Sequence, residues 1–420
     1  MSTLIGPFAQ LVTLDGLPPR GPLSDERLEI IPDAGIIVDG TLNGGGRIVD
    51  LGTYAALARE HPGAQRREVE QPTVCLPGLV DAHTHLCWAG SRAQDFAMRN
   101  AGKTYHQMAQ QGGGIRATVR HTRAASDEEL SAGLTSRLEG LRAQGITTVE
   151  CKSGYGLTVE EELRHLRLIR EAFAKTEGID GFATCLAAHV CPPEFEGDAA
   201  GYLAHVRENL WPLLQPGSRL DVFAEPSAFW GEPLETYLAE AAATGFQLTV
   251  HADQFTPGGA ALAARLGAAS ADHLEHADEA AIQALATSDT VAVALPGASI
   301  GLGEPYAPAR KLLDRGASLA ISSDWNPGSA PQGLLLAQAT ALAAAEKLTN
   351  AEVLAGITVR AAGALRLSDR GRLAVGLRAD VSLWPTRDYR EVTWCMGGMA
   401  PRCRAGTTSP AYRTTQCGDT

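Results

Sequence analysis

The sequence has little that would suit a nucleic-acid or membrane surface. Its 420 residues carry a formal net charge of -12 and contain no run of five or more basic residues, which argues against a polyanionic partner. No stretch approaches the ~18 uninterrupted apolar residues of a membrane span. The first residues, MSTLIGPFAQLVTLDG, lack the charged start and continuous apolar core of a secretory signal. We therefore expect a cytoplasmic protein that binds neither nucleic acid nor membrane.

Paired cysteines are also missing. The eight cysteines are scattered and form no CxxC pair, so neither a disulfide framework nor a zinc ribbon is expected. A hydrophobic content of 45% with 20% charged residues is ordinary for a globular protein. The cysteines are therefore interpreted as reduced thiols, several of them buried in strands.

Repeated apolar runs fill the middle of the chain, from about residue 73 to residue 367. Eight of them can be counted: 73–85, 147–156, 182–189, 220–225, 247–253, 269–276, 290–297 and 318–324. Amphipathic stretches lie between them, and one begins at Ser126 with Glu129 at the spacing of a capping box. Eight β-α units of this kind predict an α/β fold, a (β/α)8 barrel of the TIM type. Short β-like runs flank this region at both chain ends.

Six of the eight runs end in polar or ionisable residues. These are His83 and His85, Lys152 to Tyr155, His189, His251 with Asp253, His273 or His276, and Asp324. In parallel barrels the chemistry collects at the carboxyl ends of the strands. Core packing alone would not place imidazoles there repeatedly, so we expect these side chains to form a site.

A metal site is the first interpretation of this pattern. His83 and His85, two residues apart on one strand, point to the same side of the sheet. His251 from the fifth strand and Asp324 from the eighth complete a set of three imidazoles and one carboxylate, which suits zinc or iron. One open position would let the ion lower the pKa of a water molecule toward ~7.

At this point the residues resemble the amidohydrolase superfamily of metal-dependent hydrolases and, within it, the imidazolonepropionase family. Beside PGLVDAHTH (77–85), the motifs that carry this resemblance are AGSR (89–92), GGGI (112–115), KSGYGL (152–157), AAHVCPPEF (187–195), VHADQ (250–254), SADHLEH (270–276), LPGA (295–298) and SDWNPGS (323–329). The resemblance implies ring-opening hydrolysis of 4-imidazolone-5-propanoate to N-formimidoyl-L-glutamate, a step of histidine degradation. It also implies a composite β-sandwich domain of residues 1–72 plus 373–420 beside a barrel of residues 73–372. A homodimer is the assembly common in that family.

The resemblance also implies a role for each matching residue. One metal ion would be bound by His83, His85, His251 and Asp324. The substrate, a small molecule, would be held by Arg92, Tyr155, His189, Gln254, Asn326, Gly328 and Ser329. The catalytic residues would be His273, which stabilises the oxyanion, and Asp324, which moves the proton.

Physical chemistry supports parts of this assignment and leaves others open. The Arg92 guanidinium can bind a propionate through two parallel hydrogen bonds. The segment NPGS reads equally as a turn and as a ligand contact. Some family members have Glu where this chain has Gln254, and Gln cannot accept a proton. The proton shuttle therefore remains open between Asp324, Asp253 and His273.

Other residues receive no catalytic role from the sequence. Lys152 is a strand-end cation of unassigned function, and His276 is expected to face away from His273 because three residues separate them on a strand. Glu160 to Glu162 and Glu208 look like solvated helix charges. Surface or packing roles are expected for His61, His106, His121, His165 and His205.

Three other functions compete with this interpretation. A hydantoinase-like enzyme would bridge two metal ions with a carboxylated lysine on the fourth strand, but the fourth run, LDVFAE, contains no lysine. An aminohydrolase acting on a heterocyclic base shares the one-metal ligand set. A catalytically silent barrel that binds metal belongs to another class, and the full ligand set argues against it.

Overall fold

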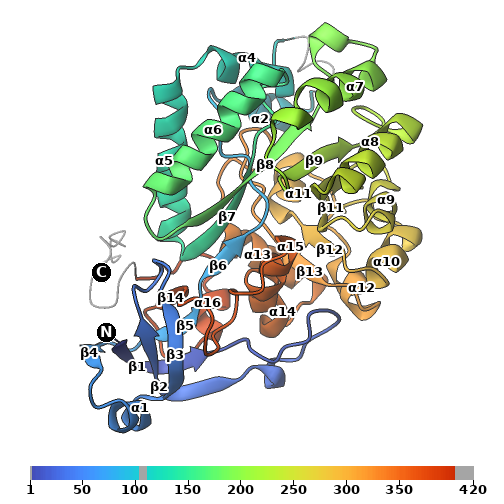
Figure 1. Ribbon diagram of the computed structural model, residues 1–420. Coiled ribbons are helices and arrows are strands. Elements are labelled where there is room, and N and C mark those ends of the chain that lie inside the picture. Colours follow the sequence, from blue (N-terminus) through green and yellow to red (C-terminus); the bar gives the residue numbers. More distant parts are fainter. Residues whose placement is uncertain (1, 104–110, 403–420) are drawn as a thin grey trace, which may run out of the picture.

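Two β-sheets organise the molecule, as the computed structural model shows for residues 2–103 and 111–402 (Figure 1). His106, Cys403, Cys417 and the end of the expected terminal domain lie outside the described residues. No helix in the described part of the chain has the length and apolar character needed to cross a membrane.

The larger sheet is the predicted barrel. Its eight parallel strands follow each other in chain order, β6 (Leu79–Asp81), β7 (Ile146–Lys152), β8 (Asp180–Ala188), β9 (Arg219–Ala224), β10 (Gln247–Ala252), β11 (Ser270–His273), β12 (Val291–Ala294) and β13 (Leu319–Ile321). The segments after β6 and β13 close the ring, because Asp324 N–H donates to the His83 carbonyl and His85 N–H to the Trp325 carbonyl, both at 3.0 Å. The TIM-type fold predicted from the eight runs is confirmed.

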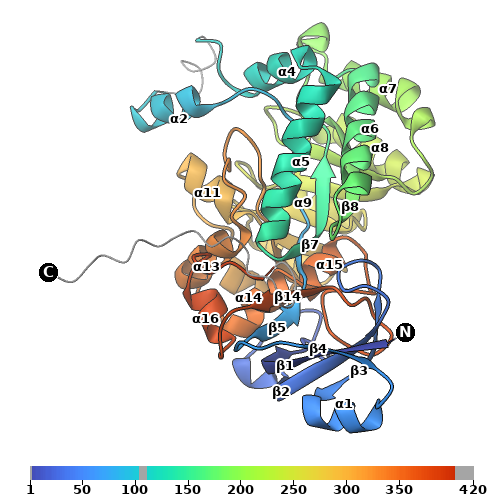
Figure 2. The same ribbon diagram turned by 90° about the vertical axis from the view of Figure 1, so that its left-hand side faces the viewer.

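Helices surround this barrel on the outside (Figure 1). They are α4 (Ile115–Ala124), α5 (Asp127–Ala143), α6 (Val159–Lys175), α7 (Ala199–Asn209), α8 (Gly231–Thr244), α9 (Gly259–Arg265), α10 (Glu279–Ala286), α11 (Pro296–Leu302), α12 (Ala309–Asp314), α13 (Leu335–Glu346), α14 (Asn350–Gly356) and α15 (Val359–Ala364). Helix α2 (Ala93–Asn100) stands apart from this ring, beyond the carboxyl ends of the strands (Figure 2). The capping box at Ser126 is confirmed, since its hydroxyl accepts from Glu129 N–H and Glu129 accepts from Ser126 N–H. The apolar residues of α5 that recur every three or four positions are buried against the barrel.

The smaller sheet joins both ends of the chain. Its six strands are β1 (Ser2–Val12), β2 (Ile30–Asp39), β3 (Arg47–Thr53), β4 (Gln65–Glu68), β5 (Val74–Pro77) and β14 (Val381–Trp384). Helix α1 (Tyr54–Glu60) packs on it, and α16 (Arg390–Trp394) follows β14. Its buried side chains, among them Phe8, Ile36 and Leu383, form a hydrophobic core separate from that of the barrel. Figure 2 shows the sheet at one end of the barrel. We propose that it is a domain of its own, with its boundary near Gly78.

The expectation that residues 73–85 form one barrel strand was wrong. β5 pairs with β1 and β14 in the smaller sheet, whereas β6 pairs with β7 in the barrel. Gly78 separates the two strands at a place where a Cβ atom would come within 2.1 Å of Thr147 Oγ1. Every residue from β5 to β6 is buried, so the apolar pattern gives no sign of this change of sheet.

Candidate active site

Four predicted metal ligands converge at the carboxyl end of the barrel. His83 and His85 follow β6, His251 lies on β10 and Asp324 follows β13. The Nε2 atom of His85 lies 3.3 Å from the Nε2 atoms of both His83 and His251. Asp324 Oδ1 lies 3.6 Å from His83 Nε2 and 3.4 Å from His85 Nε2. All four side chains are buried.

The chemistry of these donor atoms fits one cation. His83 Nδ1 donates to Asp272 at 2.7 Å, because a carboxylate only accepts, and this leaves the lone pair on Nε2 facing the other imidazoles. Ligands at the usual zinc distances of 2.0–2.1 Å lie about 3.3 Å apart in a tetrahedron, close to the separations found here. Burial lowers the pKa of His85 to about 3 and that of His251 to about 4, so both stay neutral donors at pH 7. Lone pairs that face each other in this way are stabilised by a metal ion between them.

Beneath these ligands lies a buried group of charges, Glu150, Lys152, Asp221 and Asp272, which we call the floor cluster. The Lys152 ammonium lies 2.8 Å from Asp221, 2.9 Å from Glu150 and 4.0 Å from Asp272. Burial alone would lower the pKa of Lys152, but Asp221, Glu150 and Asp272 raise it above its ordinary value. Lys152 therefore remains a cation that is paired with carboxylates inside the barrel and does not line the cavity described below.

The floor cluster holds the imidazoles in turn. Asp272 accepts from His83, and Asp221 Oδ2 lies 3.1 Å from His251 Nδ1. Carboxylates in this position fix the tautomer and orientation of histidines that bind metals. Sequence reasoning missed these two carboxylates. Asp221 is a charged position inside the mainly apolar run LDVFAE, a signal that could have identified it, whereas Asp272 lies in the polar strand SADH and gives no such signal.

A cavity of about 680 Å³ opens above the metal ligands. Its lining includes every residue predicted to hold the substrate, namely Arg92, Tyr155, His189, Gln254, Asn326, Gly328 and Ser329. His273 and Asp324 face the same cavity. The structure thus brings the predicted residues together, and their individual roles remain predictions.

Arg92 is held at the cavity wall by a partner that the sequence did not reveal. Its Nε donates to Asp95 at 2.5 Å and its Nη1 to Thr118 at 3.2 Å. Asp95 also accepts from Gly114 N–H at 2.8 Å, which ties the loop of the GGGI motif to the same pair. The Cβ position of Gly328 lies 3.5 Å from Arg92 Nη1, so the loop after β13 comes close to the guanidinium.

The NPGS segment is a turn whose polar groups bond to each other. Asn326 Oδ1 accepts from Gly328 N–H at 2.8 Å and Ser329 N–H at 2.9 Å, while its amide donates to the Asp324 carbonyl at 2.7 Å. These contacts confirm the turn, and the ligand contact, which is compatible with it, stays a prediction. They also brace the chain directly after the Asp324 carboxylate.

His273 and His276 differ in a way that the strand argument did not predict. β11 ends at His273, and φ is positive at His273 (87°) and Leu274 (73°), so His276 lies beyond the strand. His276 Nε2 lies 3.1 Å from Glu304, and its side chain is partly exposed. His273 is buried, with Nδ1 3.4 Å from Glu275. Burial lowers the pKa of His273, but Glu275, Asp324 and Asp272 raise it, and the net shift is upward.

The loop after β7 positions two further rings. His189 Nδ1 donates to the Gly154 carbonyl at 3.0 Å, and the rings of Tyr155 and His189 lie 5.5 Å apart. Glu162, expected to be a solvated helix charge, is instead fully buried behind this loop. The expectation was wrong because the loop folds back onto the first turn of α6.

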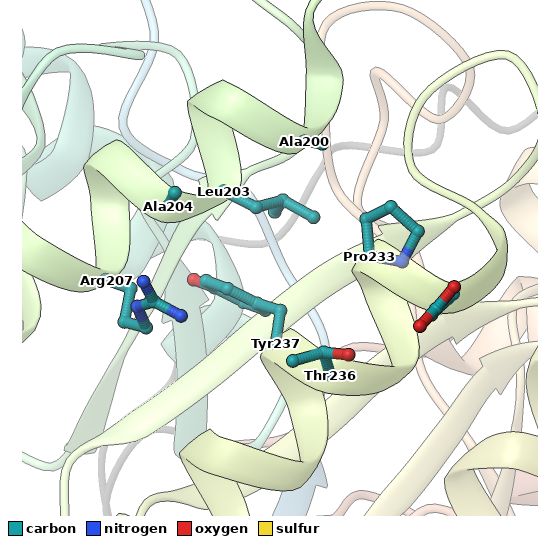
Figure 3. Close-up of a pocket in the computed structure, with 8 residues that line it drawn as sticks. Ala200, Leu203, Ala204, Arg207, Pro233, Thr236 and Tyr237 are labelled. Carbon is teal, nitrogen blue, oxygen red and sulfur yellow. The ribbon is translucent and has the colours of Figure 1, made fainter.

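Other features lie away from this cavity. His61 pairs with Asp50, and His205 packs near Phe195. A hollow of about 280 Å³ between α7 and α8, lined by Leu203, Arg207 and Tyr237, lies on the outside of the barrel (Figure 3). None of the predicted site residues lines it.

Comparisons with known proteins agree with this geometry. The model of the amidohydrolase family matches residues 74–398. The imidazolonepropionase of Deinococcus radiodurans is 44% identical over 95% of this chain and 96% of its own length, and that of Symbiobacterium thermophilum is 41% identical over 94% of this chain and 93% of its own length.

Among solved structures, a mutant atrazine chlorohydrolase from Arthrobacter aurescens, in a complex with zinc and atraton, matches with a TM-score of 0.66 at 18% identity, covering 96% of this chain and 92% of its own. The guanine deaminase of C. acetobutylicum matches with a TM-score of 0.65 at 14% identity, covering 94% and 96%. At identities of 18% and 14%, the similarity to these two structures supports the fold alone. The chain belongs to the amidohydrolase family and, within it, to the imidazolonepropionases.

Proposed function

We propose that this enzyme hydrolyses 4-imidazolone-5-propanoate to N-formimidoyl-L-glutamate with one metal ion, zinc or iron, held by His83, His85, His251 and Asp324. One observation carries the proposal: a single cavity of about 680 Å³ is lined both by His85, His251 and Asp324 of the ligand set and by Arg92. The substrate has a reacting ring and a carboxylate tail, and these two features of the cavity match its two ends.

The wall of the cavity binds and orients the substrate. Arg92, whose Nε and Nη1 are fixed by Asp95 and Thr118, holds the propionate. Tyr155 and His189 line the side of the ring, and Gln254 supplies a hydrogen-bonding amide. Fixed positions of this kind lower the entropic cost of reaching the reacting geometry.

The reaction adds water across the ring amide bond. A metal ion in the site supplies a Lewis acid that activates water at neutral pH. His273, whose pKa is raised by Glu275 against the effect of burial, donates a hydrogen bond to the carbonyl oxygen as negative charge develops there. Asp324 takes the proton of the attacking water and returns it to the ring nitrogen as the C–N bond breaks.

The arrangement also supports one metal ion over two. The fourth barrel strand, β9, has no lysine that could carry a bridging carboxyl group. Lys152 on β7 forms ion pairs with Glu150 and Asp221 in the floor cluster, so its amine is not free to carry one. We propose a homodimer as the assembly. Light scattering, which gives the molar mass in solution, tests this.

The experiment is a direct assay of the purified protein. Loaded with one equivalent of zinc or iron, it should consume 4-imidazolone-5-propanoate, seen as loss of the substrate's ultraviolet absorbance, and release N-formimidoyl-L-glutamate, identified by mass spectrometry. Absence of turnover by the loaded protein would contradict the proposal. Two bound ions per chain would instead favour a hydantoinase-like reaction.

A further inference from the structure

Glu162 lies in the first turn of α6 with its carboxylate turned inward, behind the loop that carries Tyr155. The carboxylate accepts three backbone hydrogen bonds: Oε2 from Gly154 N–H at 3.0 Å, and Oε1 from Gly156 N–H at 2.9 Å and Leu157 N–H at 2.7 Å. Burial raises the pKa of Glu162, while the hydrogen bonds from Ser153, Leu157, Gly156 and Gly154 act against that rise. The three backbone donors on this one carboxylate fix the path of the loop.

The loop needs such a support because its backbone is unusual. Gly154 has a φ of 108° and Leu157 a φ of 59°, and the left-handed conformation of a leucine costs about 1–2 kcal/mol unless its surroundings enforce it. At Gly156 a Cβ atom would come within 2.8 Å of the backbone of α6, so the loop is pressed against the helix. The hydrogen bonds of Glu162 compensate for this geometry.

The same peptide segment reaches the cavity on its other side. The Gly154 carbonyl accepts from His189 Nδ1, and because a carbonyl cannot donate, this nitrogen carries the proton. Burial lowers the pKa of His189, so the ring is neutral at pH 7 and its Nε2 atom carries no proton. Tyr155, between the two anchored glycines, lines the cavity 6.0 Å from the ring of His85.

We propose that Glu162 is a positioning residue that, through the 154–157 loop, sets the orientation of both Tyr155 and His189 toward the substrate. The proposal rests on the proposed function for the identity of that substrate. Glu162 touches neither the substrate nor the metal ligands, so it acts through the backbone alone. Its expected effect is on kcat and KM, with no effect on metal content.

Two substitutions separate positioning from general stability. Glu162→Ala removes all three acceptor bonds. Glu162→Gln keeps one oxygen for Gly156 and Leu157 but turns an amide donor toward Gly154 N–H, which disturbs the residue that holds His189. Two controls lie on the same helix: Glu160→Gln removes an exposed charge, and Leu168→Ala lowers stability through the buried face away from the loop.

We expect kcat/KM to fall about 100-fold in Glu162→Ala and about 10-fold in Glu162→Gln, as small misplacements of bound groups do. Metal content should stay at the wild-type level, and Leu168→Ala should lose stability while keeping kcat/KM. Hydrogen exchange of the amides at residues 154–157 should speed up in both Glu162 variants and in neither control. If Glu162→Ala does not fold, Glu162→Gln carries the test.

Unchanged kcat/KM in Glu162→Gln, or an equal fall in Leu168→Ala, would overturn the proposal. A wild-type protein inactive on the imidazolone would instead count against the proposed function. In that case hydrogen exchange decides alone: unchanged exchange in Glu162→Gln would overturn the positioning role, and faster exchange restricted to the loop would support it.

Discussion

The floor and the wall of the cavity hold their charges in different ways. In the floor cluster, Lys152 and its three carboxylates are all 0–1% exposed and come from the strands of the barrel itself. On the wall, the Arg92–Asp95 pair lies at the start of α2, with side chains that are 13% and 7% exposed. The floor is thus built from buried strands of the barrel, and the wall from loops and a helix end. We infer that the floor governs metal binding and stability, and that the wall governs substrate affinity.

Loss of a metal ligand should give the largest effect. His251→Ala removes one of three imidazoles, so we expect less than about a tenth of the wild-type metal content and a fall in kcat of at least about 1,000-fold. Metal analysis measures the metal content, and the absorbance assay measures kcat. His205→Ala, on the surface of α7, is the control. Normal turnover in His251→Ala would remove this residue from the site.

The floor itself is tested by Lys152→Met. Removing the ammonium leaves Asp221 and Glu150 buried without their cation, which destabilises proteins by about 3–5 kcal/mol. Chemical denaturation measures this loss, and metal affinity should fall about 10–100-fold because the carboxylates that orient the ligands lose their anchor. The exposed Lys347→Met is the matched control. If stability and metal affinity were unchanged, the distinction between floor and wall would be lost.

The wall should respond differently to the loss of its own cation. Arg92→Ala should raise KM about 10–100-fold, the value of a charge-assisted hydrogen bond or two, with metal content unchanged. Steady-state kinetics with metal analysis give both numbers. Arg116→Ala, a mostly exposed cation on α4 paired with Glu196, is the control. An unchanged KM would remove Arg92 from substrate binding.

The buried imidazole of His165 belongs to neither the floor nor the wall of the cavity, so we expect it to affect stability without affecting activity. His165 on α6 is buried, and neither ring nitrogen has a hydrogen-bond partner among the described residues. Burial lowers its pKa to about 4, assisted by Arg164 and Arg123. A lowered folded-state pKa gives stability that is present above the unfolded value of 6.5 and is lost as the pH falls through 4. Between pH 7 and pH 5 this loss amounts to about 2 kcal/mol.

His165→Leu should remove that part of the acid sensitivity while kcat/KM and metal content at pH 7 stay unchanged. The measurement is the free energy of unfolding at both pH values, compared between wild type and variant so that other titrating groups cancel. An equal loss of stability on acidification in both proteins would show that His165 does not stay neutral in the folded state.

The barrel and the convergence of the predicted residues could be predicted from the sequence because polar residues mark the ends of the apolar runs that form the strands. His83, His85, His251 and Asp324 each follow or end an apolar run, and parallel strands bring such ends together. The change of sheet at Gly78 could not be predicted, because both strands are buried and the apolar run continues through the glycine. Glu162 was misjudged for a related reason: an acidic residue in the first turn of a helix is normally solvated, and only the folded loop shows otherwise.

The pairing of β5 with β14 has a consequence for the order of synthesis. Ser382 donates to the carbonyl of Pro77, 305 positions earlier in the chain, and Pro77 is followed within a few residues by His83 and His85, the first two proposed metal ligands. The ribosome therefore releases both histidines long before β14, the strand that completes the smaller sheet on the other side of Gly78. A chain that stops before residue 381 leaves one edge of β5 unpaired, and open edges promote aggregation. A chain truncated before residue 381 therefore lacks the strand that covers this edge of β5.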